Sequence, residues 1–504
     1  MGRAMRVLRY RITTLGCRVN HAEARELESL LVERGLVAAR VGERADLEVV
    51  HTCAVTETAA AKSRQAIRRS RRRQHLGGSF ANFPEAQRHS PDSAGDANLP
   101  EILVTGCLGS TNPEEAVQLA GGPDRVIAHQ ADGGLTLTDR FAQRLDRCLA
   151  AHRVQGSLRT RWPGSCREKI VPLPVVMPRA ASAHVRAELK IQDGCDAACT
   201  FCVIPKIRRT LRSKRIADAV DEARRLVELG HCEIVLTGIF IGAYGHETAL
   251  RRRQARPGPQ PLADLVDAVA RVGGLQRLRI SSLEPGDVCE VLLDAMVANS
   301  PVVAPHLHLP LQSGSDAILR RMNRQYRLGD YLQMIQMVKQ RLTTPDGLPP
   351  AITTDVLCGF PGETEEDFRA TVGVARQVGF LHMHVFGYSP RRLTAAARWK
   401  QLFVAPAIIK ARVRRLIDLE SDPVDGLALR YRRRLLGRSV RVIIEQPDKN
   451  DASIMRGRCD HYAEVWLPTN RRRGTLVQAQ ITRVTPARTV GRVLSPIVSL
   501  PVLA

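Results

Sequence analysis

Three cysteines within eight residues constrain the centre of this chain more than any other feature. Cys195, Cys199 and Cys202 follow a strand-like run at 187–191. Thiolates at this spacing can bind one metal centre. Zinc usually takes four ligands in paired Cys-x-x-Cys units, and ferredoxin-type runs carry a fourth cysteine, which has no counterpart nearby here. A [4Fe–4S] cluster with three protein ligands would leave one iron open to a substrate, while a zinc or structural role stays open as the alternative.

The region around this triplet, residues 184–420, alternates strand-like and helical segments. Helical patterns at 216–229, 262–272 and 363–378 separate successive apolar strand-like runs. Such alternation predicts an α/β fold with parallel strands, and six units predict an open (β/α)6 partial barrel, because eight would be needed to close it. The six strand-like runs are at 187–191, 233–236, 277–281, 306–309, 353–357 and 384–388.

Two further domains are expected on either side. Residues 7–152 alternate strand and helix signals, which predicts a second parallel α/β domain, interrupted at 77–100 by a flexible surface insertion rich in Gly, Ser, Asn, Asp and Pro. Residues 432–498 contain short strands separated by turn residues, which predicts a small antiparallel β-barrel.

The composition favours a polyanionic partner. The 504 residues include 75 Lys and Arg against 51 Asp and Glu, a net charge of +24. Such an excess favours nucleic acid, although nearly all of it is arginine and a genome rich in G and C would produce the same bias. No apolar run is long enough to span a membrane, so we expect a cytoplasmic protein without a membrane partner. Its twelve cysteines are then better explained by metal ligation than by disulfides.

A second cysteine triplet is dispersed through the N-terminal domain. Cys17, Cys53 and Cys107 each follow one of the three predicted strands, and Gly16 and Gly106 directly precede two of them. The carboxyl ends of parallel strands share one edge of a sheet, so the three thiols could converge on one site. Geometry alone leaves three unrelated loop cysteines as the alternative.

At Cys195, Cys199 and Cys202 the chain resembles the radical S-adenosylmethionine superfamily. The resemblance implies that the open iron binds S-adenosylmethionine and that reductive cleavage gives methionine and a 5′-deoxyadenosyl radical. It also implies cofactor contacts by the aromatic residue of the motif and by polar residues at strand ends, namely Phe201, Thr237, Gly238, Ser281, Ser282, Gln312 and Asp355.

The N-terminal motifs resemble the methylthiotransferase family within that superfamily. They are Leu-Gly-Cys-Arg-Val-Asn at 15–20, Thr-Cys-Ala-Val-Thr at 52–56, Lys-Ser-Arg-Gln at 62–65 and Thr-Gly-Cys at 105–107. The resemblance implies a second [4Fe–4S] cluster on Cys17, Cys53 and Cys107, and a C-terminal β-barrel known as the TRAM domain. Cys-Arg-Val-Asn is most similar to the threonylcarbamoyladenosine tRNA branch, whereas the isopentenyladenosine branch typically shows Cys-Gln-Met-Asn. The chain departs from the family pattern at His51, Lys206, Arg209 and Phe240.

Basic residues on a predicted helix and in the C-terminal region are the RNA-binding candidates. Arginine suits phosphate and base contacts, but a solvated charged face is the commoner role of such runs. The candidates are Lys62, Arg64, Arg68, Arg471, Arg472 and Arg473, with Tyr462 as an exposed stacking aromatic.

The resemblance implies insertion of a methylthio group at C2 of N6-threonylcarbamoyladenosine in tRNA, with flavodoxin or ferredoxin as electron donor. Two alternatives stay open. One is methylthiolation of an aspartate of a ribosomal protein, and the other is a non-catalytic iron–sulfur protein that binds RNA.

Overall fold

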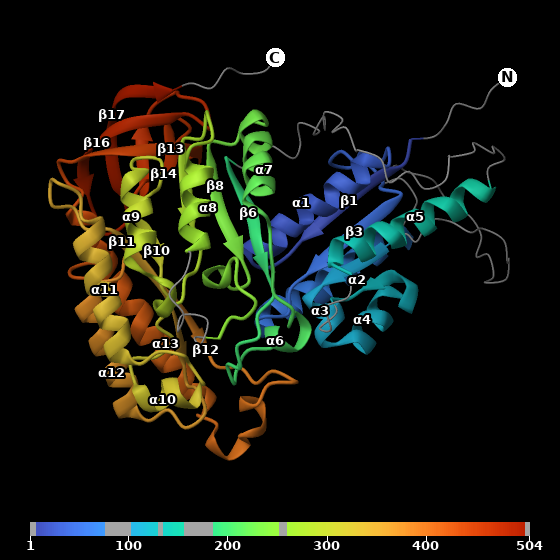
Figure 1. The fold of residues 1–504 in the computed structure, drawn as a ribbon, viewed down its shortest axis with the longest axis horizontal. Coiled ribbons are helices and arrows are strands. Elements are labelled where there is room, and N and C mark those ends of the chain that lie inside the picture. Colours follow the sequence, from blue (N-terminus) through green and yellow to red (C-terminus); the bar gives the residue numbers. More distant parts are fainter. Residues whose placement is uncertain (1–6, 76–101, 130–134, 156–184, 251–259, 499–504) are drawn as a thin grey trace. The chain divides into compact units, whose positions relative to one another are not determined.

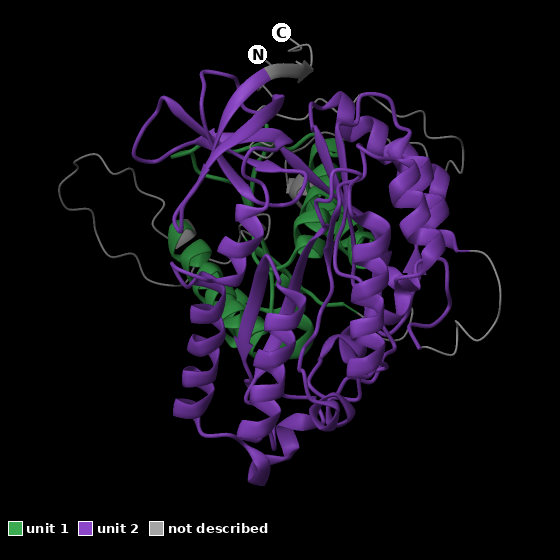
Figure 2. Ribbon diagram, turned by 90° about the vertical axis from the view of Figure 1, so that its left-hand side faces the viewer, with its two compact units in different colours: residues 1–178 green, residues 179–504 purple. Residues whose placement is uncertain are grey.

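The computed structural model describes residues 7–75, 102–129, 135–155, 185–250 and 260–498, so the predicted insertion at 77–100 lies outside the described residues. The chain divides into two compact units, Met1–Pro178 and Arg179–Ala504 (Figure 2). In the described part of the chain, none of the helices combines the length and apolar character that a membrane span requires.

Unit 1 contains a five-stranded parallel sheet with the order β2-β1-β3-β4-β5. Its central strand β3 is buried along its whole length, as expected for a parallel strand covered on both faces. Its strands are β1 (Arg9–Thr14), β2 (Val37–Ala38), β3 (Leu47–Thr52), β4 (Ile102–Gly106) and β5 (Val126–Ile127). The helices are α1 (Arg18–Glu33), α2 (Glu57–His75), α3 (Cys107–Thr111), α4 (Pro113–Ala120) and α5 (Leu137–Gln155).

Unit 2 begins with the predicted partial barrel (Figure 1, green to orange). Parallel pairing joins β6 to β8 and β9, and β10 to β11 and β12, while bridges at Leu278–Val303 and Ser282–His308 connect the two groups. Its strands are β6 (Arg186–Asp193), β8 (Glu233–Gly238), β9 (Arg277–Ile280), β10 (His306–His308), β11 (Ala351–Cys358) and β12 (His382–Gly387), with the short β7 (Arg212–Ser213) antiparallel to β6.

Amphipathic helices cover the outside of this sheet and bury the largest apolar cluster of the chain. Sequence signals mark several of their ends. For example, Thr364 caps α12 in a reciprocal capping box with Asp367, and Gly379 ends it in the left-handed conformation. The helices are α6 (Ile204–Ile207), α7 (Ile216–Glu228), α8 (Pro261–Ala270), α9 (Glu290–Ala298), α10 (Asp316–Arg321), α11 (Leu328–Leu342), α12 (Glu365–Val378), α13 (Pro406–Ser421) and α14 (Leu427–Arg433).

The C-terminal strands form a closed barrel in the order β13-β14-β15-β17-β16 (Figure 1, red). Every pair is antiparallel, as predicted, except the β15–β17 closure, which is parallel. The strands are β13 (Ser439–Pro447), β14 (Ile454–Cys459), β15 (Glu464–Pro468), β16 (Leu476–Val484) and β17 (Thr489–Val498).

A buried charged network attaches this barrel to the partial barrel within unit 2. Arg277 Nε donates to Asp460 Oδ1 at 2.7 Å and Arg279 Nε donates to Glu233 Oε1 at 3.0 Å, and both arginines are at most 1% exposed. Burial alone would raise the pKa of Glu233, but Arg279, Arg277 and Arg186 lower it to about 2. A charge buried here is strongly destabilising if its partner is removed. The predicted parts at 184–420 and 432–498 thus belong to one compact unit, and their independence as domains stays a prediction.

Candidate active site and cluster sites

The loop that carries Cys195, Cys199 and Cys202 follows directly on β6. The Cys195 amide donates to the Arg208 carbonyl at 2.8 Å, which fixes the start of the loop. Gly194 turns the chain into it with φ +84°, and a Cβ at that position would overlap the Thr210 carbonyl. Only glycine therefore fits this turn without a shift of the backbone.

Of the three cysteines in this loop, Cys195 is buried, and Cys199 and Cys202 are half-buried. Burial raises the pKa of all three thiols, and burial together with repulsion from the Cys199 thiolate raises the pKa of Cys202 to about 12. Arg324 Nη1 donates to Cys199 Sγ at 3.4 Å while Arg324 Nη2 contacts Glu284 Oε1 at 2.5 Å. Thiols whose pKa is raised in this way need a nearby cation to be deprotonated, so the chemistry of the three side chains suits an iron–sulfur cluster.

The predicted cofactor contacts lie on neighbouring strands of the partial barrel, mostly at the carboxyl ends where such folds place their ligands. Phe201 lies in the cluster loop and meets Phe360 edge-on, with ring centroids 6.3 Å apart. Gln312 has φ +59°, and its amide donates to the Asp355 carbonyl at 2.8 Å. Thr237 and Gly238 end β8, and Ser281 and Ser282 follow β9. Their contacts with S-adenosylmethionine remain a prediction.

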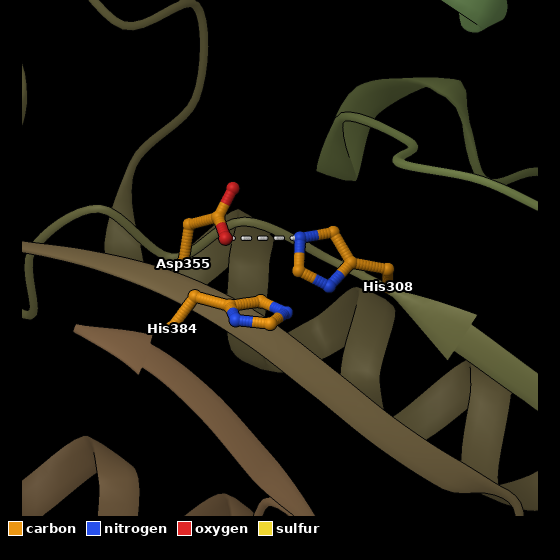
Figure 3. A group of neighbouring side chains, drawn as sticks. All are labelled: His308, Asp355 and His384. Atoms are coloured by element: carbon orange, nitrogen blue, oxygen red, sulfur yellow. Dashed lines mark ion pairs between the residues drawn. The ribbon is translucent and has the colours of Figure 1, made fainter. Parts of the chain in front are cut away.

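Asp355 differs from the other candidates because it lies inside β11 and is already engaged by a histidine. His308 Nε2 is 3.2 Å from Asp355 Oδ1, and His308 Nδ1 is 2.9 Å from Thr353 Oγ1. Figure 3 shows His384 beside this pair, and one ligand atom from each of the three residues lies within 4.8 Å of the others. Such a group can hold a proton or a polar substituent inside the barrel. The sequence analysis missed it, although histidines at alternate positions of β10 and β12 share a strand face and could have indicated it.

In unit 1, the dispersed cysteines lie at the carboxyl ends of three adjacent strands. Cys17, Cys53 and Cys107 directly follow or nearly follow β1, β3 and β4, which neighbour one another in the sheet. A Cβ on Gly16 would lie 2.5 Å from Cys53 Cβ and 2.8 Å from its Sγ, so the first and second cysteine loops touch. Cys53 and Cys107 are buried while Cys17 is exposed. The arrangement fits one shared cluster with an accessible side.

The residues of the N-terminal motifs hold these loops together. Asn20 Nδ2 donates to the carbonyls of Leu15 at 2.8 Å and Thr52 at 2.9 Å, which links the ends of β1 and β3. Ser63 Oγ accepts from the Cys53 amide at 3.0 Å and donates to the Cys53 carbonyl at 2.8 Å. The motif residues Asn20 and Ser63 therefore fix the loops that carry Cys17 and Cys53.

His51, a departure from the family pattern, is accommodated by an internal partner. Its Nε2 lies 3.2 Å from Glu23 Oε2, and neither side chain is more than 1% exposed. His51 and Glu23 thus form a buried pair in the core of unit 1, close in sequence to Cys53.

The side chains proposed to contact RNA differ in their exposure and in whether they are already ion-paired. Lys62 and Arg68 on α2 and the three residues Arg471, Arg472 and Arg473 are exposed. Arg64 is instead held by Glu57, with Nη2 and Oε1 2.6 Å apart.

The prediction that Tyr462 is exposed is wrong, because its side chain is half-buried. Its ring stacks on His306 with centroids 4.1 Å apart, and the guanidinium of Arg458 lies 4.5 Å from the ring centroid. Tyr462 therefore packs in the joint between the two barrels of unit 2. Sequence reasoning assigned it to solvent because its partner His306 lies on a distant strand.

Comparison with known proteins agrees with this architecture. The Radical SAM superfamily model matches residues 189–375, and the model of the Uncharacterized protein family UPF0004 matches residues 9–128. The threonylcarbamoyladenosine tRNA methylthiotransferase MtaB of Bacillus subtilis is 33% identical over 474 residues, which cover 93% of each chain. The tRNA-2-methylthio-N(6)-dimethylallyladenosine synthase of Acidothermus cellulolyticus is 32% identical over 481 residues, 95% of this chain and 86% of that protein.

Among solved structures, the radical S-adenosylmethionine methyltransferase TsrM of Kitasatospora setae matches with a TM-score of 0.51 and 14% identity, over 78% of this chain and 75% of that chain. This likeness shows the fold alone.

Proposed function

The chain belongs to the radical S-adenosylmethionine methylthiotransferase family, and from that premise we propose that it adds a methylthio group at C2 of N6-threonylcarbamoyladenosine next to the anticodon of tRNA. The observation that carries the proposal is the pairing of two cysteine sites, one in each unit. Cys195, Cys199 and Cys202 would hold a cluster that supplies the electron for cleavage of S-adenosylmethionine.

A second cluster, on Cys17, Cys53 and Cys107, is the part of this proposal that separates methylthiolation from simple radical chemistry. Sulfur insertion needs a source of sulfur as well as a radical, and a second iron–sulfur site in another unit supplies a place for it. Convergence of the three strand ends supports this role, as does the contact between Gly16 and Cys53. A flavodoxin or ferredoxin would supply the electrons.

The tRNA substrate is supported by the names of the similar proteins compared above, each of which is a tRNA-modifying enzyme. Sequence identity does not distinguish a threonylcarbamoyladenosine from a dimethylallyladenosine substrate, because the two kinds of relative are 33% and 32% identical to this chain. Arg18 and Val19 within the Cys17–Asn20 motif favour the threonylcarbamoyl branch. The dimethylallyl substrate is the second candidate.

Mass spectrometry of tRNA nucleosides tests the proposal. A strain without this gene should accumulate N6-threonylcarbamoyladenosine without its 2-methylthio derivative, and the gene should restore the derivative. Restoration of only the 2-methylthio derivative of dimethylallyladenosine would support dimethylallyladenosine as the substrate instead. Cleavage of S-adenosylmethionine under reducing conditions separates the enzyme from a non-catalytic iron–sulfur protein that binds RNA.

A further inference from the structure

The segment that follows the last barrel strand has an unusual charge composition. No Asp or Glu occurs between Asp367 and Asp418, a stretch that contains the end of β12, a loop with two short helical turns, and most of α13 (Figure 1, orange). Within it, residues 386–410 carry the basic side chains Arg391, Arg392, Arg398, Lys400 and Lys410. We call residues 386–410 the post-barrel face.

Four cations of the post-barrel face have no carboxylate partner in the part of the chain that the structure describes. Arg392, Arg398, Lys400 and Lys410 are exposed and have no ion-pair or hydrogen-bond partner for their side chains among the described residues. By contrast, Arg415 on the next turns of α13 pairs with Glu365 at 3.3 Å. These four exposed cations thus have no carboxylate partner among the described residues of unit 2, which leaves them available to a polyanion.

The same face also exposes aromatic side chains. Of all the aromatic residues in the described ranges, only Phe386 and Phe403 are exposed, at 43% and 37%. Phe403 is held edge-on against Tyr388, with ring centroids 5.9 Å apart, so its orientation is partly fixed. Exposed aromatic rings among unpaired cations are the combination with which proteins stack bases and neutralise phosphates of single-stranded RNA.

Direct contacts fix the post-barrel face beside the cluster loop. The Ala396 amide donates to the Thr200 carbonyl, between Cys199 and Cys202, at 2.9 Å. Trp399 packs edge-on against Phe360 at 6.1 Å, the same ring that Phe201 of the cluster loop contacts. An RNA bound on this face would thus lie next to the open side of the radical chemistry.

We propose that the post-barrel face binds the single-stranded anticodon loop of the tRNA, with Arg398 and Lys400 contacting phosphates and Phe403 stacking on a base. This inference rests on the proposed tRNA substrate and adds where unit 2 receives it. An acidic protein segment would satisfy the cations but would leave the exposed Phe403, which contacts Tyr388 only edge-on, without a ring stacked on its face, so RNA is the better match.

Equilibrium binding of a fluorescein-labelled tRNA anticodon stem–loop at two salt concentrations tests the proposal. Arg398→Glu combined with Lys400→Glu should weaken binding by at least about tenfold at low salt and reduce the salt slope by about one to two, because two phosphate contacts are lost. Phe403→Ala should weaken binding by about tenfold with an unchanged salt slope, since stacking involves no counterion release.

The matched control is Arg225→Glu combined with Arg376→Glu. These two exposed arginines also have no ion-pair partner among the described residues, and they lie near the carboxyl ends of α7 and α12. Such helices run back along the barrel, so the control charges lie at the end of the barrel remote from the cluster loop. The control should keep most of the wild-type affinity although it removes the same net charge.

The outcomes separate this inference from the proposed function. If wild-type protein binds the stem–loop but the post-barrel variants bind like the control variant, the post-barrel face is not the RNA site and the proposed function stands. If wild-type protein does not bind the stem–loop at all, the tRNA substrate itself is contradicted. Melting temperature and iron content of each variant show that a lost affinity does not reflect misfolding.

Discussion

The two cysteine triplets differ in how the chain assembles them. In unit 2 the three thiols occupy eight consecutive residues after one strand, whereas in unit 1 they follow three separate strands that are neighbours only in the folded sheet. The local triplet depends on a few contacts of one loop. The dispersed triplet depends on the register of a whole sheet edge and on the side chains, such as Asn20, that cross it.

We infer from this difference that the two cysteine sites have separate roles. The local loop includes Cys199, which accepts a hydrogen bond from Arg324, and it is bordered by the post-barrel face. The dispersed site has one exposed thiol, Cys17, and two buried ones. Predictions that damage one triplet while sparing the other therefore test the account step by step.

The largest expected effect is that of Cys202→Ala. Loss of one of three thiolates should release the cluster of unit 2 and reduce formation of 5′-deoxyadenosine to background, because the loop contains no fourth cysteine to replace it. The unit 1 cluster should stay visible by absorbance and electron paramagnetic resonance. Retained cleavage of S-adenosylmethionine would falsify the assignment of this triplet.

A matched pair of glycine substitutions should separate the two sites by backbone geometry. Gly194→Ala and Gly106→Ala both place a Cβ at positive φ, +84° and +91°, and both would overlap a backbone carbonyl. Each should cost more than the roughly 1–3 kcal/mol of backbone strain alone. Gly194→Ala should remove S-adenosylmethionine cleavage, whereas Gly106→Ala should remove only the iron of unit 1.

Gly230→Ala is the control for this pair. Gly230 also has positive φ, +89°, but no atom lies within 4 Å of the added Cβ. It should lose stability by about 1 kcal/mol and keep both clusters. If Gly230→Ala and Gly106→Ala lose equal amounts of iron, the close approach of the strand ends in unit 1 is not what holds that site.

A pH scan should probe the joint between the two barrels of unit 2, where His461 lies near Asp460 and Arg279. Burial lowers the pKa of His461 to about 4, from about 6.5 in the unfolded chain, so the folded protein keeps this side chain neutral. Stability should fall by on the order of 3 kcal/mol as the pH drops from about 6.5 to 4, because the unfolded chain takes up the proton first.

Denaturant unfolding followed by tryptophan fluorescence, with Trp466 in the C-terminal barrel as a reporter, measures this loss. His461→Gln should flatten the pH dependence in that window, since the side chain can no longer be protonated. Parallel curves for the wild type and the variant would place the pH dependence elsewhere.

The smallest effects should come from the residues that orient the ligands. Asn20→Ala removes the link between the ends of β1 and β3 and should reduce retention of the unit 1 cluster by about 10- to 100-fold, as is typical for such supporting residues. Arg324→Met should act similarly on the unit 2 cluster. If each variant weakened the opposite cluster equally, the two sites would not be independent.

The sequence predicted the strands well where apolar runs were bounded by helices. All six barrel strands and the three cysteine-bearing strands of unit 1 lie where expected, to within a few residues. The short edge strands β2 and β5 were missed because two residues carry no period. β14 was missed because its sequence, Ile-Met-Arg-Gly-Arg-Cys, places charges inside a strand.

Long-range pairing is what the sequence could not show. Arg277 and Arg279 are ordinary strand residues until Asp460, more than 180 positions later, provides the partner that allows their burial. The stacking of Tyr462 on His306 likewise joins residues far apart in the sequence, so the sequence alone did not indicate it. The post-barrel face was overlooked because its cations do not form a contiguous run, and only exposure and the lack of partners distinguish them.

The most direct test of the central claim, two cysteine sites with separate clusters, is the iron content after anaerobic reconstitution. Wild-type protein should bind about eight irons per chain. A triple Cys→Ala variant at 195, 199 and 202 and another at 17, 53 and 107 should each bind about four, with only the latter still cleaving S-adenosylmethionine. A wild-type value that saturates near four, unchanged by the substitutions in unit 1, would contradict the account.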